Sequence, residues 1–495
     1  MQSLSNDLVR TVQNSTLNAC FRILGYLLFV LSIAMLITAV VSYNYAETIA
    51  WIFFADSLLI AFIASLLIIN TKEITQFSKR YLFFITSSAW LIICFFSAIP
   101  LHQTIPTLSW TDAWFETVSA ITTTGSTVLS GLNNTAKGVL FWRAILQWIG
   151  GVGIIVMAIA ILPALKIGGM KLFKTESSDI SDKAMPRSSK ISSAILITYL
   201  TITILASSSY YFAGMNAFDA ITHGMTTTAT GGFSNYDESF GYFNSIPIMT
   251  WLASLWMLLA AMPFLLFVQM FSRDKFAVIT DPQVKAFVII VVGASCLLTF
   301  YQVEENQRDW FSALTHSVFN VISVITTCGY ASEDYSLWGS VALIAFFYLT
   351  FSGGCSGSTS GGLKMFRTQL AWMLLKKQLT LLIHPNAIVT QKYGNKKIND
   401  ELLGTVLAFC FIYFATIAIL ALILSFYHLD LLTALTGAAT AVSNVGPGLG
   451  DIIGPAGNFS TLPDGAKLWL SVGMIMGRLE ILTILILFTP QYWQY

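Results

Sequence analysis

The sequence predicts an all-α polytopic membrane protein in which four tandem helix–pore loop–helix repeats surround one central pore, preceded by two extra transmembrane helices. Three observations support this fold class: a composition poor in charge, a series of long apolar runs, and a glycine-centred cluster that occurs four times. Only 10% of the 495 residues are charged and 55% are hydrophobic, whereas soluble proteins carry about 25% charged residues. Such a chain is suited to lipid rather than to water.

The charged and metal-ligating residues exclude several functions. A net charge of +1 argues against nucleic acid as a partner, because nucleic-acid-binding proteins carry a basic excess. The six cysteines lie apart in apolar sequence without a CxxC pair, so we expect neither a disulfide framework nor a zinc site. No Walker or dinucleotide-binding glycine motif lies in a strand–turn–helix setting, so we expect no nucleotide to bind this chain.

Apolar runs long enough to span a membrane occur ten times. About 20 apolar residues cross the hydrocarbon core, and continuous runs are typical of helices rather than of barrel strands. We expect spans, the eighth of them interrupted, at 23–43, 48–70, 81–99, 138–163, 191–212, 247–272, 284–303, 338–380, 401–426 and 467–489.

Lys and Arg are distributed unequally between the two sides of these spans. If the N-terminus is cytoplasmic, the outer loops hold only Lys137, Arg308 and Lys467. The positive-inside rule therefore predicts a cytoplasmic N-terminus. The largest cytoplasmic loop, 164–190, is expected to be a solvated connector or a docking site for a partner.

Four small polar clusters follow apolar segments that are too short to cross a membrane. They are TTTG ending at Gly125, TATG at Gly231, TTCG at Gly329 and SNVG at Gly446, and they recur about once every hundred residues. A regular period with the same internal order indicates a repeat architecture, here span, short helix, glycine turn and span. Non-helical backbone is tolerated at membrane depth only where protein buries it or water reaches it. We therefore expect the four turns to surround one axis.

These turns are candidate cation ligands. A ring of backbone carbonyls can replace the hydration shell of a monovalent cation, and glycine allows backbone angles that a Cβ would forbid. The residues expected to form this filter are Thr123, Thr124, Gly125, Ala229, Thr230, Gly231, Thr327, Cys328, Gly329, Asn444, Val445 and Gly446.

Each of the short helices before these turns starts near an acid. An acid at a helix N-terminus caps it and suits the helix dipole, and the partly negative C-terminal end then faces the cation. The four acids expected to act in this way are Asp112, Asp219, Asp309 and Asp430.

The motifs resemble the Trk/Ktr/HKT superfamily of potassium transporters. The resemblance covers about residues 81–490 and rests on TTTGST, TATGGFSNYD, TTCGY and NVGPGLGD. The two additional spans at 23–70 are similar to those of the TrkH-type bacterial membrane subunit. The resemblance implies potassium uptake across the bacterial inner membrane, K⁺ at the filter positions only, a homodimer, and a cytosolic ring of nucleotide-binding subunits similar to TrkA. Cys328 departs from the expected Ala or Thr, but a backbone ligand is indifferent to this change.

A segment rich in glycine and hydroxyl residues interrupts the span at 338–380. So many glycines cannot hold a regular helix, and a break in lipid is costly unless it lines a cavity. The resemblance implies that this segment is an intramembrane gate, while the alternative is a kink that lets helices pack closely. Its residues are Gly353, Gly354, Cys355, Ser356, Gly357, Ser358, Thr359, Ser360, Gly361 and Gly362.

Two basic residues complete the predicted gate. Arg478 lies near the middle of the last span, where a charge is costly and usually functional. A cation facing a cation pathway is an electrostatic barrier, and the resemblance implies this role. Alternatively, Arg478 pairs with a buried acid other than Glu480 or with carbonyls of the glycine loop. Lys364 is expected to join the gate or to extend its amine to the cytoplasmic surface.

The repeats divide the chain into five parts. We expect an N-terminal pair of transmembrane helices at 1–80, repeat 1 at 81–165, a cytoplasmic connector with repeat 2 at 166–275, repeat 3 with the glycine-rich loop at 276–398, and repeat 4 at 399–495.

Two other classes of protein compete with a pore. The GxSG pattern at Gly354–Gly357 and the HxxxN pattern at His316–Asn320 resemble intramembrane serine proteases, but they leave the four repeats unexplained. A secondary transporter coupling K⁺ to H⁺ or Na⁺ is commonly built from two inverted repeats, whereas four repeats of one orientation favour a pore. We therefore expect a potassium-conducting protein and not an enzyme.

Overall fold

The computed structural model describes residues 2–71, 79–160, 185–272, 275–394, 396–398 and 400–494. Within these ranges the regular structure is helical apart from a hairpin of β1 (Lys392–Tyr393) and β2 (Lys396–Lys397). Six helices of this described part are long and apolar enough to cross a membrane, or eight if each of two bent pairs is one span. The predicted all-α polytopic class is therefore confirmed. Most of the expected connector at 164–190 lies outside the described residues, namely 164–184.

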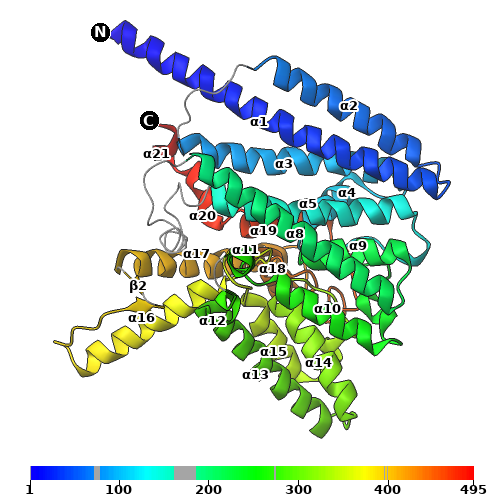
Figure 1. Ribbon diagram of the computed structural model, residues 1–495, viewed down its shortest axis with the longest axis vertical. Coiled ribbons are helices and arrows are strands. Elements are labelled where there is room, and N and C mark those ends of the chain that lie inside the picture. Colours follow the sequence, from blue (N-terminus) through cyan, green and yellow to red (C-terminus); the bar gives the residue numbers. More distant parts are fainter. Residues whose placement is uncertain are drawn as a thin grey trace.

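The two N-terminal helices form an antiparallel pair on one flank of the molecule. Helices α1 (Gln2–Asn44) and α2 (Ala50–Ile69) lie side by side next to α3, at the top of Figure 1. The hydroxyls of Ser32 and Ser57 each donate to the other residue's carbonyl, both at 2.9 Å. Side chains such as Trp51 remain exposed on this pair, as expected of a surface that faces lipid.

The described residues after α2 contain four copies of one unit, each with an outer helix, a short helix, an extended turn and an inner helix. In chain order, the outer, short and inner helices are α3 (Lys79–Thr104), α4 (Trp110–Ile121) and α5 (Lys137–Ala160); α8 (Met185–Ala213), α9 (Ala217–Thr228) and α10 (Pro247–Ala260); α13 (Pro282–Glu304), α14 (Trp310–Ile325) and α15 (Ser340–Phe351); and α17 (Asp400–Ser425), α18 (Leu431–Ser443) and α19 (Asp464–Arg478).

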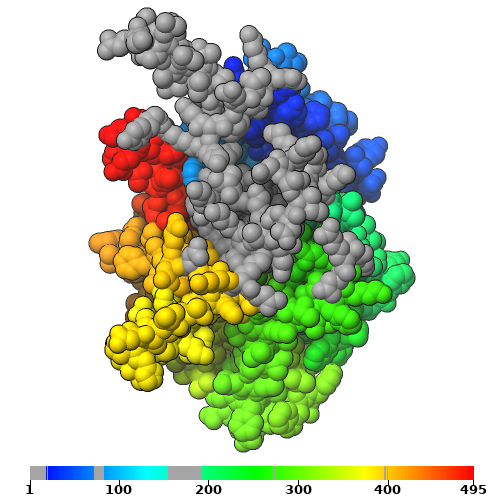
Figure 2. Space-filling view, turned by 60° about the vertical axis from the view of Figure 1, so that its left-hand side comes forward, coloured from blue at the N-terminus to red at the C-terminus, as the bar shows by residue number. Residues whose placement is uncertain are grey.

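The four units close into a ring. Each inner helix packs against the short helix of the next unit: α5 against α9, α10 against α14, α15 against α18, and α19 back against α4. Figure 2 shows the same order, because the colours follow one another around the outline from blue through green and yellow to red. The short helices and the turns after them are therefore enclosed by helices, and they form much of the buried core.

The short helices are capped in two different ways. Asp309 and Asp430 are N-caps that accept backbone N–H groups, as predicted. For Asp112 and Asp219 the prediction is wrong by three residues, because the caps are Ser109 and Asn216 and each acid lies one turn inside its helix. This arrangement resembles a capping box, in which an acid follows a polar cap by three residues.

Three of the four inner helices are interrupted. Helix α10 meets α11 (Phe264–Ser272) at a 90° bend, and α19 meets α20 (Ile481–Leu485) at 108°. The spans predicted at 247–272 and 467–489 are therefore bent pairs of helices rather than single continuous helices. Pro263 explains the first bend, because proline cannot donate to the preceding turn. The second occurs at Glu480, whose φ is +66°.

The third interruption is the glycine-rich segment 353–362, which separates α15 from α16 (Met365–Ile383). Shorter elements complete the fold: η1 (Leu132–Asn134), η2 (Ser239–Phe243), α12 (Ala277–Thr280), η3 (Tyr335–Trp338), η4 (Ile486–Phe488) and α21 (Pro490–Trp493).

Candidate functional site at the centre of the four repeats

In every repeat the chain leaves the short helix through the same backbone conformations. A left-handed residue with φ between 49° and 57° comes first, and a glycine of positive φ follows two residues later. The residue between them donates its N–H to the carbonyl five residues earlier, as Thr124 does to Ser119 at 2.9 Å. The left-handed residues are Thr123, Thr230, Thr327 and Asn444, and the glycines are Gly125, Gly232, Gly329 and Gly446.

This register corrects the expected alignment of the second repeat by one residue. Gly232, with φ +73°, is the counterpart of Gly125, whereas Gly231 corresponds to Thr124. Ala229 is the helix C-cap and matches Thr122. The expected alignment used the glycine of the TATG string, Gly231, but the glycine with a positive φ is the next residue, Gly232. The Gly-Gly pair at 231–232 was the sequence signal that a second alignment was possible.

The four turns touch one another in a closed ring. A Cβ added to any of the four glycines would overlap the carbonyl oxygen of the residue before the glycine in the next repeat. Glycine is thus required both by its φ and by the close approach of a neighbouring backbone. The pairs are Gly125 with the carbonyl of Gly231, Gly232 with that of Cys328, Gly329 with that of Val445, and Gly446 with that of Thr124. These four carbonyls therefore form a ring around one axis.

A buried ion pair between Glu116 and Arg143 contacts the backbone of the first two turns. Glu116 on α4 accepts the N–H of Val128 at 2.9 Å and the Nε–H of Arg143 at 2.8 Å, and both charged side chains are almost completely buried. Arg143 also donates to the carbonyl of Ser234 in the second turn at 3.0 Å, and its guanidinium lies over the ring of Phe233. The pair therefore holds two neighbouring turns together.

In the third and fourth repeats an uncharged side chain accepts the backbone N–H that corresponds to that of Val128. In the third repeat Asn320 accepts the N–H of Ser332 at 3.1 Å, and in the fourth Thr436 accepts that of Leu449 at 3.1 Å. Asn320 was singled out from the sequence only as part of the protease-like HxxxN pattern, and Glu116 and Thr436 were not singled out, although a polar residue on a short apolar helix is a usable signal.

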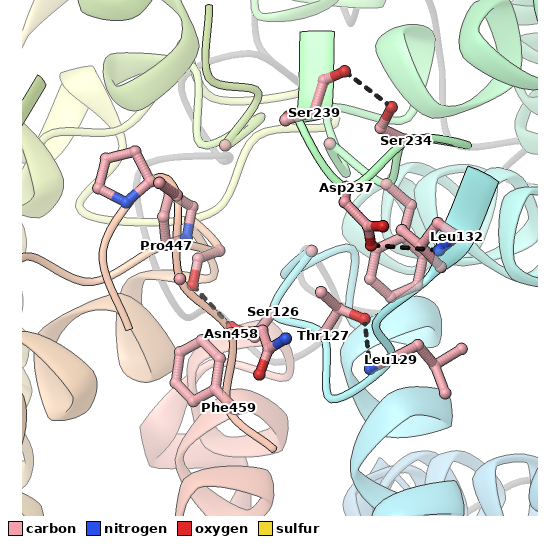
Figure 3. A pocket seen from close by; sticks show the side chains of 18 of the residues that line it. Ser126, Thr127, Leu129, Leu132, Ser234, Asp237, Ser239, Pro447, Asn458 and Phe459 are labelled. Atoms are coloured by element: carbon pink, nitrogen blue, oxygen red, sulfur yellow. Dashed lines mark hydrogen bonds between the residues drawn. The ribbon is translucent and has the colours of Figure 1, made fainter. Parts of the chain in front are cut away.

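A cavity of about 190 Å³ lies on the side of the ring where the chain leaves the turns. All four glycines line it, together with residues from the loops after the first, second and fourth turns. Figure 3 shows these loops meeting at the cavity, with Asp237 accepting the N–H of Leu132 at 3.1 Å. Ser126 donates to the carbonyl of Gly446 at 2.7 Å. A small solute that enters this cavity reaches all four turns.

The glycine-rich segment 353–362 lies against the turns at their helix ends. The hydroxyl of Thr359 lies 3.2 Å from that of Thr230 and 3.1 Å from the carbonyl of Ala260. Gly361 donates its N–H to Thr327 Oγ1 at 2.6 Å, and a Cβ on Gly361 would crowd Asn444 in the fourth repeat. The segment therefore contacts the second, third and fourth turns.

Arg478 reaches the same segment from the fourth repeat. Its guanidinium donates to the carbonyls of Thr359 at 2.9 Å and Gly150 at 3.2 Å, and the side chain is buried. The sequence left open whether Arg478 faces the pore, pairs with a buried acid or pairs with carbonyls of the glycine loop. In the structure one of its partners is a carbonyl of the glycine loop. Arg478 is the last residue of α19, beside the bend, rather than the middle of a continuous span. Glu480 pairs instead with Arg367.

Lys364 also points into the glycine-rich segment. Its Nζ donates to the carbonyl of Ser360 at 2.5 Å. Its amine therefore has a partner inside the segment. This contact favours a place beside the glycine-rich segment over an amine extended to the cytoplasmic surface.

Apolar helices long enough to cross a membrane, arranged around four glycine turns that close on one another, define a polytopic membrane protein. The chain belongs to the TrkH family, described as cation transport proteins, whose model matches residues 49–495. Because this is a family of transport proteins, the chain is not an enzyme, and the serine protease alternative is set aside.

Relatives of this chain cover nearly all of its length. It is 49% identical to the Trk system potassium uptake protein TrkI of Halomonas elongata, over 96% of each chain. It is 34% identical to the Trk system potassium uptake protein TrkH of Escherichia coli, over 96% of this chain and 99% of the relative. The crystal structure of the potassium transporter TrkH from Vibrio parahaemolyticus matches with a TM-score of 0.89 at 33% identity, over 97% of this chain and 100% of the other.

Proposed function

We propose that this chain is the ion-conducting subunit of a potassium uptake system. The relatives at 49% and 34% identity are named as Trk system potassium uptake proteins. The observation that carries the proposal is the closed ring, in which each of four glycines abuts a carbonyl of the next repeat. A narrow ring of backbone carbonyls suits an ion that exchanges its water shell for oxygen ligands.

K⁺ is selected, in this proposal, by the backbone of the four turns. The carbonyls of the left-handed residues and of the residues after them are the ion ligands, and the glycines let the turns approach. Each short helix ends at its turn, so its partly negative C-terminus faces the ion and favours a cation. The proposed filter consists of Thr123, Thr124, Gly125, Thr230, Gly231, Gly232, Thr327, Cys328, Gly329, Asn444, Val445 and Gly446.

The glycine-rich segment 353–362 is the proposed gate, together with Lys364 and Arg478. Support comes from the hydrogen bonds of Thr359 and Gly361 to the second and third turns. Arg478 adds a buried positive charge at the same level, which opposes the passage of a cation. Opening requires the segment and the guanidinium to move away from the turns.

The proposed setting is the bacterial inner membrane, with the N-terminus in the cytoplasm. The bias of Lys and Arg toward one side of the spans supports this orientation. We further propose that the chain is a homodimer and works with a cytosolic TrkA-like ring of nucleotide-binding subunits. The names of the relatives, which speak of a Trk system, support the existence of further components.

Growth of a bacterial strain that lacks its own potassium uptake systems tests this function. Expression of the chain is expected to restore growth at low external K⁺. Gly232→Ala, expressed to the same level in the membrane, is expected to restore it poorly. Failure of the unaltered, membrane-inserted chain to support growth with its partner subunit present would contradict the proposal.

A further inference from the structure

Gln147 reaches from the first repeat to the second turn. It lies on α5 and is completely buried. Its Nε2 donates to the carbonyl of Gly231 at 2.6 Å, and its Oε1 accepts the N–H of Phe233 at 3.1 Å. The side-chain amide of Gln147 therefore bonds to the backbone of both neighbours of Gly232.

This contact makes the ring of four carbonyls unequal. The carbonyl of Gly231 has a side-chain donor, whereas in the described part of the chain no hydrogen bond is donated to the other three. A carbonyl oxygen has two lone pairs, so a donor bound to one of them fixes the direction of the carbonyl and leaves the second lone pair for another partner. The other three members of the ring are Thr124, Cys328 and Val445.

Gln147 also explains why the second repeat has a glycine at this position. Gly231 does not have a positive φ, so its own backbone does not require glycine. A Cβ there would lie 2.5 Å from the Cδ and Oε1 of Gln147 and 2.8 Å from its Nε2. The side chain of Gln147 therefore occupies the space that a side chain at 231 would need.

We propose that Gln147 is a positioning residue of the filter: its amide fixes the direction of the Gly231 carbonyl and thereby sets the discrimination between K⁺ and Na⁺. The proposal rests on the proposed function, because it assigns a role to Gln147 only if the four turns select the ion. Gln147 acts through the backbone of the second turn and does not itself ligate the ion.

Gln147→Leu tests the hydrogen bonds at similar size. We expect the ratio of K⁺ to Na⁺ permeability, measured from reversal potentials of the purified chain in liposomes, to fall about fivefold, since one net hydrogen bond contributes roughly that factor. A merely structural role would lower the currents of both ions together and leave the ratio unchanged. Trp148→Phe is the matched control, because Trp148 is the next residue of α5 and its indole bonds to Thr203 instead. It is expected to keep the unaltered ratio.

A double variant tests the complementarity of Gln147 and Gly231 even if Gln147→Leu does not fold. Gly231→Thr alone is expected to abolish most of the current, because the new side chain collides with the amide. Gln147→Ala combined with Gly231→Thr is expected to recover K⁺ current several-fold above Gly231→Thr alone, at a reduced K⁺ to Na⁺ ratio. A double variant no better than Gly231→Thr would overturn the inference.

The two proposals fail in different ways. An unaltered chain that conducts without preferring K⁺ would contradict the proposed function itself. An unaltered chain that prefers K⁺, beside a folded Gln147→Leu with the same ratio, would overturn only the role of Gln147.

Discussion

Arg478 donates a hydrogen bond of 2.9 Å to the carbonyl oxygen of Thr359, so the end of α19 is tied to the glycine-rich segment. Its second bond, to the carbonyl of Gly150, reaches α5. One guanidinium thus connects the first, third and fourth repeats on the helix side of the turns. Among the described residues the hydrogen bonds of Arg478 go to these two carbonyls. A buried charge without a carboxylate partner there is costly at membrane depth, which favours a function for it over simple packing.

Arg478→Ala is expected to raise ion flux, because it removes both the positive charge and the two bonds that hold the segment. Deletion of several residues within 353–362 is expected to raise flux further. Tracer uptake into liposomes at matched protein measures both effects. Lys376→Ala, which removes an exposed cation on α16, is the control and is expected to leave flux unchanged. Equal or lower flux in both gate variants would contradict the gating proposal.

Gly232→Ala is expected to reduce K⁺ selectivity, because the added Cβ overlaps the carbonyl of Cys328. Gly131 provides a matched control: it also has a positive φ, +72°, but a Cβ there would meet nothing within 4 Å. Both alanines carry the strain of a left-handed backbone, about 1 kcal/mol, so only the collision distinguishes them. Relative uptake of K⁺ and Na⁺ that is the same in both variants would count against the filter assignment.

Glu480→Gln is expected to raise flux several-fold. Glu480 pairs with Arg367 at 2.5 Å, and the Arg367 guanidinium also lies 3.7 Å from the centre of the Phe409 ring. Because Arg367 follows the glycine-rich segment and Glu480 follows Arg478, the pair fastens the two parts of the proposed gate to each other. Loss of the charge on Glu480 weakens that link.

The control for Glu480→Gln is a second ion pair made by a basic residue of α16. This pair lies away from the glycine-rich segment. Asp400→Asn disrupts the pair of Lys377 with Asp400, whose carboxylate is exposed. This variant is expected to leave tracer flux unchanged. If Glu480→Gln and Asp400→Asn give the same flux, the pair of Arg367 with Glu480 is not part of the gate.

Glu116→Ala is expected to destabilise the protein by about 3 kcal/mol, because it leaves the buried Arg143 without its carboxylate partner. Thermal unfolding in detergent measures the change. Glu333→Ala is the comparison, since its pair with Arg308 is partly exposed and such pairs contribute about 1 kcal/mol or less. A similar melting temperature for the two variants would show that the Glu116 pair does not hold the turns.

The architecture could be predicted from sequence because its signals are strong and local. Spans of about 20 apolar residues and four glycine clusters of similar order indicate both the membrane and the repeats. The bend after α10 had a sequence signal in Pro263 itself. The bend at Glu480 had none, because apolar residues continue on both sides of it.

The candidate site was predictable in composition but not in detail. The register of the second turn depends on which of Gly231 and Gly232 adopts a positive φ, which a sequence string does not reveal. The side chains behind the turns left one usable signal. Arg143 and Gln147 are four residues apart in an apolar helix, so they share one face, and both reach the second turn.

The reversal potential of the purified chain in liposomes under opposed K⁺ and Na⁺ gradients shows directly whether the pore selects K⁺. If the four turns form a potassium-selective pore, the current reverses close to the K⁺ equilibrium potential. Reversal near the Na⁺ equilibrium potential, or at a potential that shifts with the proton gradient, would contradict this account.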